Sequence, residues 1–179
     1  MMKSLGLSVF VLVTAAFPAR AQTNAVRKDE VKYFQLSIWR TAQVYDRKYS
    51  IHGARLALYG SNRDLFGLDA GLAVENTRDM KGFQWGFIAW ARRDCSGWQN
   101  AVVGVVKRNM TGFQSGVFNG AKVAKGFQLG LFNMTTEAAG LQVGLINKAT
   151  WLSGLQIGLL NIATDNDSHP ILPIINWRF

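Results

Sequence analysis

Apolar and polar residues alternate with a period of two along most of this chain, and the alternation restarts at a glycine every 14 or 15 residues. In the copy that begins at Gly140, the string GLQVGLIN places apolar residues at alternate positions and Gln142 between them. A period of two is typical of a strand rather than a helix. Two apolar residues then stand together before Asn147, and such a break predicts a corner at which side chains keep pointing inward. We therefore expect the apolar side chains of each copy to be buried.

The glycine-led unit occurs eight times, six times in a close form such as GFQWGFIA and twice in the looser forms GARLALYG and GLDAGLAV. A fixed spacing of this kind indicates one supersecondary element copied in tandem. Repeat proteins usually have binding or structural roles rather than catalytic ones. The repeat glycines are Gly53, Gly67, Gly82, Gly97, Gly112, Gly126, Gly140 and Gly154.

The pattern predicts an all-β repeat protein, a parallel β-solenoid of about eight coils with 14 or 15 residues each. Equivalent residues of neighbouring coils then stack about 4.8 Å apart. Stacked amides form hydrogen-bonded ladders in cross-β arrays, so we expect a glutamine ladder and an asparagine ladder. If the glutamines lie on the sheet face, Gln142→Thr is expected to be mild. The two columns are Gln84, Gln99, Gln114, Gln128, Gln142 and Gln156, and Asn119, Asn133, Asn147 and Asn161.

The alternative fold is a ten-stranded outer-membrane β-barrel, with the segments Val31 to Thr41 and Ile171 to Phe179 as its first and last strands. The even strand number and the C-terminal aromatic residue fit such a barrel. Two physical points favour the solenoid. Hairpins of constant length do not accumulate the register shift that a closed barrel needs. The apolar segment of one unit also covers only about 13 Å, whereas the lipid band is about 25 Å tall.

The N-terminus has the features of a signal peptide over residues 1–21. Lys3 precedes an apolar run, and Ala19 and Ala21 are small residues at the positions that a signal peptidase recognises, so cleavage is expected before Gln22. The alternative, a membrane anchor, is disfavoured because the run is shorter than the roughly 20 residues of a spanning helix. The remaining chain divides into a lead-in and N-terminal cap strand (22–52), the eight-unit repeat domain (53–163) and a C-terminal cap (164–179).

The string GLQVGLINKATWLSGLQIGLLN and the ending LPIINWRF resemble a bacterial family of surface-repeat proteins with tandem G-[FLV]-Q-x-G-L-x-N units, known mainly from spirochaetes and related Gram-negative bacteria. The resemblance covers most of the chain after residue 21. Ala101 and Gly104 depart from the motif, and Arg55 and Asp69 replace its glutamine in the first two units. The resemblance implies export and surface exposure, and it brings no chemistry to particular residues.

Candidate catalytic or metal-binding residues are few. His52 and His169 belong to opposite ends of the predicted stack, and no nucleophile has a histidine partner within the same element. The only cysteine, Cys95, takes an apolar position of the repeat and is expected to be buried and unreactive. The run from Asp165 to Asp167 offers oxygen ligands but lacks the glycine and distal glutamate of a calcium loop. We therefore predict no catalytic site, no cofactor and no metal.

Charge is the more informative feature. The formal net charge of +9 becomes +7 when Lys3 and Arg20 leave with the signal peptide. Basic residues recur at one part of the connecting turn, so a solenoid gathers them on one edge. This basic edge either keeps the coils soluble or binds a repeating polyanion. It lacks the interleaved aromatics of single-strand nucleic-acid binding, so glycan is preferred over nucleic acid. The edge comprises Arg63, Arg78, Arg92, Arg93, Lys107, Arg108, Lys122 and Lys125.

These features predict an exported, non-enzymatic protein at the cell surface, outer membrane or periplasm of a Gram-negative-type bacterium. It acts as a structural or interaction surface toward envelope or host surface components, with anionic glycan or lipopolysaccharide as the candidate ligand of the basic edge. The alternative is a small integral outer-membrane barrel that serves as a pore or anchor. The oligomeric state is left open at this point.

Overall fold

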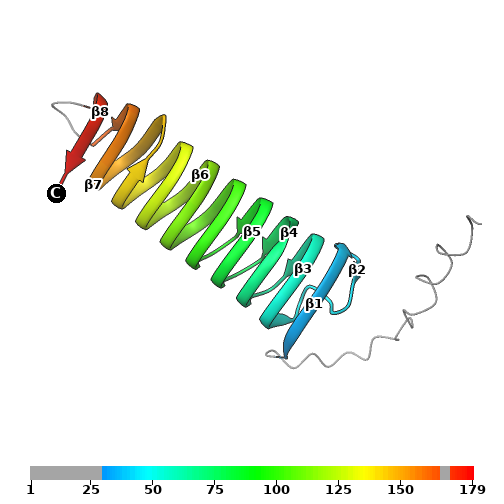
Figure 1. The fold of residues 1–179 in the computed structure, drawn as a ribbon. Coiled ribbons are helices and arrows are strands. Elements are labelled where there is room, and N and C mark those ends of the chain that lie inside the picture. Colours follow the sequence, from blue (N-terminus) through cyan, green and yellow to red (C-terminus); the bar gives the residue numbers. More distant parts are fainter. Residues whose placement is uncertain (1–29, 166–169) are drawn as a thin grey trace, which may run out of the picture.

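The computed structural model describes residues 30–165 and 170–179, which form one elongated stack of coils (Figure 1). The sheet order is β2-β1-β3-β4-β5-β6-β7-β8, so apart from the small strand β2 each strand lies beside the next one along the chain. The strands are β1 (Val31–Trp39), β2 (Ala42–Gln43), β3 (Ser50–Asn62), β4 (Leu65–Asn76), β5 (Met80–Ala91), β6 (Cys95–Val143), β7 (Ile146–Ala163) and β8 (Ile171–Arg178).

Apart from β2, which pairs with β1 in the antiparallel direction, the strands from β1 to β7 pair in parallel and place each repeat glycine on the glycine of the next unit. Gly53 pairs with Gly67, and Gly67 pairs with Gly82. β6 is 49 residues long because the chain bends through successive coils without leaving the hydrogen-bonded ladder. The predicted parallel β-solenoid is confirmed, in place of the barrel that was its alternative. The predicted signal peptide and most of the lead-in lie outside the described residues.

The repeat glycines are required because neighbouring coils approach closely at these positions. Gly112 has a φ of 114°, and a Cβ added there would lie 2.4 Å from the carbonyl oxygen of Gly97. At Gly144 the same atom would lie 2.2 Å from the carbonyl oxygen of Gly130. Only glycine combines this backbone conformation with the absence of a side chain. The positions of the glycines along the chain therefore determine where one coil can approach the next this closely.

The expected burial of the apolar side chains is wrong. In the unit of Gly140, Gln142 is only 2% exposed, whereas Leu145 is 44% exposed. The physical reason is the composition of the inward side, where the glutamines lie between two glycines, or between Gly97 and Ala101 at Gln99, and have room for a long side chain. Identical amides one coil apart then bond to one another, so their burial carries little desolvation cost. The predicted corner exists, but Leu145 and the neighbouring half-buried Ile146 are not part of the core there.

An apolar column occupies another part of the interior. It lies two residues before each repeat glycine and changes from large residues to mostly small ones along the stack. Cys95 belongs to this column and is 1% exposed, which confirms the prediction for it. Burial, with a smaller effect of Asp69, raises the pKa of its thiol to about 12. The column comprises Ile51, Leu65, Met80, Cys95, Met110, Ala124, Ala138 and Leu152.

Both ends of the stack are capped by strands that depart from the repeat. β1 continues the parallel stack onto β3, and its buried Gln35 donates from Nε2 to the carbonyl of Tyr45 at 2.8 Å. At the other end β8 pairs with β7 in the antiparallel direction. The predicted turn residues Asn166 and Asp167, and the histidine at 169, lie outside the described residues. His52 lies in β3 at the N-terminal end, with its ring 4.6 Å from that of Phe66.

Candidate interaction surfaces

The glutamines form one continuous ladder inside the stack. Gln156 donates from Nε2 to Oε1 of Gln142 at 2.7 Å, and Gln142 donates in the same way to Gln128 at 2.7 Å. The chain of bonds continues through Gln114 and Gln99 to Gln84 at 2.7 to 2.8 Å. Every bond points toward the N-terminal end. The predicted glutamine ladder is confirmed, but it lies in the interior rather than on an open sheet face.

The asparagines form a second internal ladder that runs in the opposite direction. Asn119 donates from Nδ2 to Oδ1 of Asn133 at 2.9 Å, and Asn147 donates to Asn161 at 2.8 Å. The same amide groups also donate to backbone carbonyls, as Asn147 does to Ile157 at 2.9 Å. The polar side chains that recur most regularly are thus used within the fold, and they are not available to a ligand.

A buried ion pair terminates the glutamine ladder at its N-terminal end. Arg55 and Asp69 replace glutamine in the first two units, and both side chains are fully buried. Arg55 bonds to the carboxylate twice, through Nε at 2.8 Å and through Nη2 at 2.6 Å. Asp69 also accepts the last ladder bond, from Nε2 of Gln84 at 2.9 Å. The departure from the motif therefore closes the ladder with a charge pair and forms no site open to solvent.

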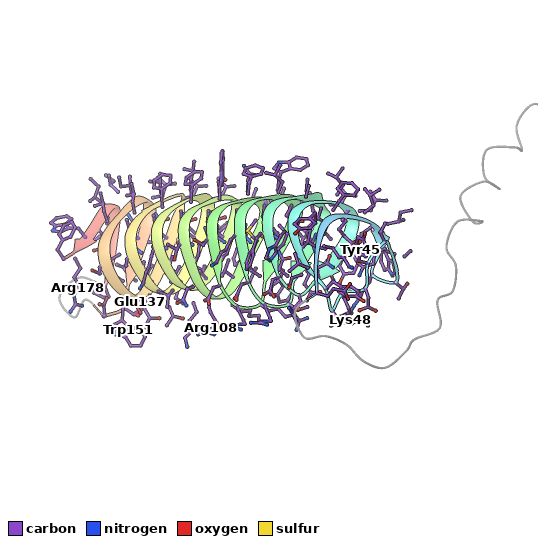
Figure 2. The ribbon with its side chains drawn as sticks, turned by 90° about the horizontal axis from the view of Figure 1, so that it is seen from below. Tyr45, Lys48, Arg108, Glu137, Trp151 and Arg178 are labelled. Atoms are coloured by element: carbon purple, nitrogen blue, oxygen red, sulfur yellow. The ribbon has the colours of Figure 1, made fainter. Side chains whose placement is uncertain are left out.

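The basic edge predicted from the sequence exists as a stacked column. The backbone N–H of Arg78 bonds to the carbonyl of Arg63, that of Arg93 to Arg78, and that of Arg108 to Arg93, at 2.8 to 3.1 Å. Figure 2 shows Arg108, Glu137 and Trp151 along one long edge of the stack, with ring-bearing side chains standing off the opposite edge. The basic edge is not free of aromatic rings, however, because Trp151 lies on it.

An acidic column neutralises the first part of this edge, which was not predicted. Asp64 pairs with Arg63 at 3.1 Å and with Arg78 at 3.7 Å, and Asp79 pairs with Arg93 at 3.6 Å. Arg92 pairs with Glu75 at 2.6 Å. Burial on its own raises the pKa of Glu75, but the hydrogen bond and charge of Arg92, with smaller contributions from Ser61 and Arg40, together bring the pKa below its usual 4.5. The repeated Arg-Asp dipeptides were the signal in the sequence for this pairing.

The second part of the basic edge is open. Within the described residues, no acidic side chain lies within salt-bridge distance of Lys107, Arg108, Lys122 or Lys125, and all four are exposed. The acidic column ends because Asn109 takes the place of aspartate, and its Nδ2 donates to Oδ1 of Asp94 at 2.7 Å. Lys107 Nζ also lies 5.4 Å from the ring centroid of Trp90. We call these four residues the open basic patch.

The third and fifth residues after each repeat glycine form a second surface, which we call the apolar face. Its fifth positions are all apolar and more than one third exposed, from Val102 at 37% to Leu159 at 71%. No charged residue occurs at either position, and the polar ones are Asn100 and Ser115. The third positions are Leu56, Ala70, Trp85, Asn100, Ser115, Leu129, Val143 and Ile157, and the fifth are Leu58, Leu72, Phe87, Val102, Val117, Leu131, Leu145 and Leu159.

A groove of about 590 Å³ runs along the C-terminal part of the apolar face. Its floor is formed by the glycines at the fourth position, and its walls by the side chains at the third and fifth positions. Ile174 of β8 lines one end and has a φ of 67°, which is unusual for a β-branched residue. The floor is Gly116, Gly130, Gly144 and Gly158, and the walls are Leu129, Leu131, Val143, Leu145, Ile157 and Leu159, with Ser115.

Other kinds of site are not found in the part of the chain that the structure describes. No group of three or more His, Cys, Asp or Glu residues in it is placed to hold a metal ion. The same residues include no helix that is long and apolar enough to span a membrane. Comparison of the chain with protein-family models, with curated proteins and with solved structures finds no match in any of the three.

Proposed function

We propose that this protein is an exported, non-enzymatic component of the bacterial envelope that acts as an interaction surface. The proposal rests on one observation, the different use of side chains on the inside and on the outside of each coil. The recurring amides bond to one another inside, while the outside offers an uncharged apolar face and a basic edge, repeated coil after coil. Such a surface suits an extended or repeating partner better than a single small substrate.

The envelope location is supported by the signal-peptide pattern of residues 1–21 and by the resemblance to bacterial surface-repeat proteins. Fractionation of cells that produce the full chain, with N-terminal sequencing of the product, tests it. We expect the protein in the periplasmic or outer-membrane fraction with Gln22 as its first residue. An uncleaved protein in the cytoplasm would contradict the proposal.

The open basic patch is the second element of the proposal, as a site for a repeating polyanion such as an acidic glycan or lipopolysaccharide. Its four cations are exposed and have no acidic partner among the described residues, whereas Arg78 and Arg93 are already paired. Single surface charge contacts are weak, so binding depends on several cations at once and decreases with salt.

A pair of charge-reversal variants tests the patch. Arg108→Glu with Lys122→Glu is expected to lower the affinity for lipopolysaccharide at least tenfold at low salt, with an unchanged circular-dichroism spectrum. The control, Arg47→Glu with Lys48→Glu, changes the net charge equally at the N-terminal end. If both double variants lose the same affinity, net charge rather than the patch controls binding, and the site proposal is wrong.

A further inference from the structure

The apolar face is larger than the isolated apolar patches of monomeric proteins. It is about 43 Å long, because eight coils and the cap strand β1 stack at about 4.8 Å per layer. It is about 16 Å wide when the flanking first and sixth positions, which are aliphatic or aromatic in every unit, are included. The face therefore covers about 700 Å², which exceeds the roughly 300–600 Å² of the largest patch on a typical monomer. No charged side chain interrupts its third and fifth positions.

A second copy of the chain provides a partner of the right size. Two such faces packed together bury about 1,400 Å², which lies within the range of stable protein interfaces, about 1,200–2,000 Å². Flat sheets also pack face to face in ordinary β-sandwiches, with interdigitated apolar side chains. An interface between identical faces closes as a two-fold dimer, so it leaves no apolar surface to recruit further copies.

The shape of the face favours one of the two possible two-fold arrangements. Its N-terminal half carries the bulky side chains of Trp85 and Phe87, which are 54% and 58% exposed. Its C-terminal half contains the groove over Gly130 and Gly144. Parallel solenoid axes would place the bulky residues against each other and the groove against itself. Antiparallel axes place the bulky residues of one copy over the groove of the other.

We propose that two copies of this chain form an antiparallel dimer through the apolar face, with Trp85 and Phe87 of each copy seated in the groove beside Leu131 of its partner. This interface is independent of the cellular location and of the polyanion site proposed above. It leaves the two basic edges on the outside of the dimer, because Arg108 is the eleventh residue after Gly97 and thus about half a coil away from the third and fifth positions. The dimer therefore displays one open basic patch on each outer side.

Two other occupants of the face fit the observations less well. An anionic bilayer attracts the basic edge, but that edge and the apolar face are about half a coil apart along the chain, so they cannot both contact one flat membrane. An extended peptide in the groove would need hydrogen-bond partners for its backbone. The floor offers few, since Gly144 N–H already bonds to the carbonyl of Ile157 at 2.9 Å.

The first test measures the mass of the mature chain in solution by sedimentation equilibrium. We expect the wild type to be a dimer at micromolar concentration. Leu131→Glu with Leu145→Glu places two charges in the groove and is expected to weaken dimerisation at least 100-fold. The control, Thr111→Glu with Ser153→Glu, adds the same charge at exposed positions outside the face and is expected to remain dimeric. The far-ultraviolet circular-dichroism spectrum confirms that each variant is folded.

Thiol crosslinking tests the orientation, because the native Cys95 is buried and does not react. Leu58→Cys and Leu159→Cys place a thiol at either end of the face. In the antiparallel dimer a short bifunctional reagent joins the two variants to each other when they are mixed, and joins neither variant to itself. Self-crosslinking of each variant would show parallel axes and overturn the arrangement. A monomeric wild type, whether or not it binds phosphatidylcholine–phosphatidylglycerol vesicles, would overturn the dimer itself.

Discussion

The two halves of the solenoid have the same fold but are stabilised by different interactions. The coils before Gly112 have apolar interiors with large residues such as Met80 and Met110, and they carry the ion pairs of the basic edge. The coils from Gly112 onward add the asparagine ladder, and their apolar column is mostly alanine. The glutamine ladder runs through both halves, so one backbone path can be completed either by apolar packing and charge pairs or by a second column of amides.

Coil length accounts for part of the difference. The units that begin at Gly67, Gly82 and Gly97 have 15 residues, and the later units have 14. The additional residue lies at the basic edge, where Asp79 and Asp94 accept backbone N–H bonds from the following coils. Two of the 15-residue coils contribute a methionine to the apolar column, Met80 and Met110, whereas two of the 14-residue coils from Gly112 onward contribute an alanine.

The largest expected effect comes from breaking the buried ion pair of the N-terminal half. Asp69→Ala leaves the guanidinium of Arg55 fully buried without its carboxylate. Breaking a buried pair in this way costs about 3–5 kcal/mol. The free energy of unfolding, measured by urea titration with tryptophan fluorescence, is expected to decrease by that amount.

The double variant Arg55→Gln with Asp69→Gln sharpens this comparison. It extends the glutamine ladder into the first two coils, so that the ladder runs through all eight units. We expect it to recover most of the stability that Asp69→Ala loses. If the double variant is as unstable as the single one, two ladder glutamines cannot replace the buried ion pair in the first two coils.

The next effect concerns the amide ladder itself. Gln142→Leu keeps the approximate volume but leaves Oε1 of Gln128 without its donor and removes the acceptor of Gln156. The expected cost is about 1–3 kcal/mol for each buried group left unpaired. Gln142→Thr is expected to be similarly harmful, contrary to the mild effect that a position on an open sheet face would have. Ser153→Thr, at an exposed position, is the control and should change stability by less than about 0.5 kcal/mol.

The smallest effect is a pH dependence confined to the N-terminal half. The pKa of Glu75 is lowered in the folded chain, so its ionised form stabilises the fold above pH 4.5, and this contribution is lost as the pH decreases through the lowered pKa. The free energy of unfolding, measured by urea titration at pH 7 and at pH 3, should decrease less between the two pH values for Glu75→Gln than for the wild type. The same loss in both proteins would show that the Arg92–Glu75 pair is not responsible.

Much of the fold could be predicted because the repeat is a local property of the sequence. The glycine spacing predicted the number and length of the coils, and identical residues at each phase predicted the ladders. The direction of the side chains could not be predicted in the same way. Alternation shows that Leu145 and Gln142 lie on opposite sides, but it does not show which side is inside. The usual preference for buried apolar residues gave the wrong answer here.

The candidate surfaces were predicted only in part for a related reason. The alignment of Arg63, Arg78, Arg93 and Arg108 followed from their spacing, whereas their neutralisation by Asp64 and Asp79 depends on distances across coils. The apolar face and its groove were missed altogether, since both depend on the outward direction of the apolar residues. By itself, the sequence determined the coil, its length and its stacking through the positions of glycine. The tertiary structure decided which side is the interior, because a narrow coil buries long amides only where the next coil supplies their hydrogen-bond partners.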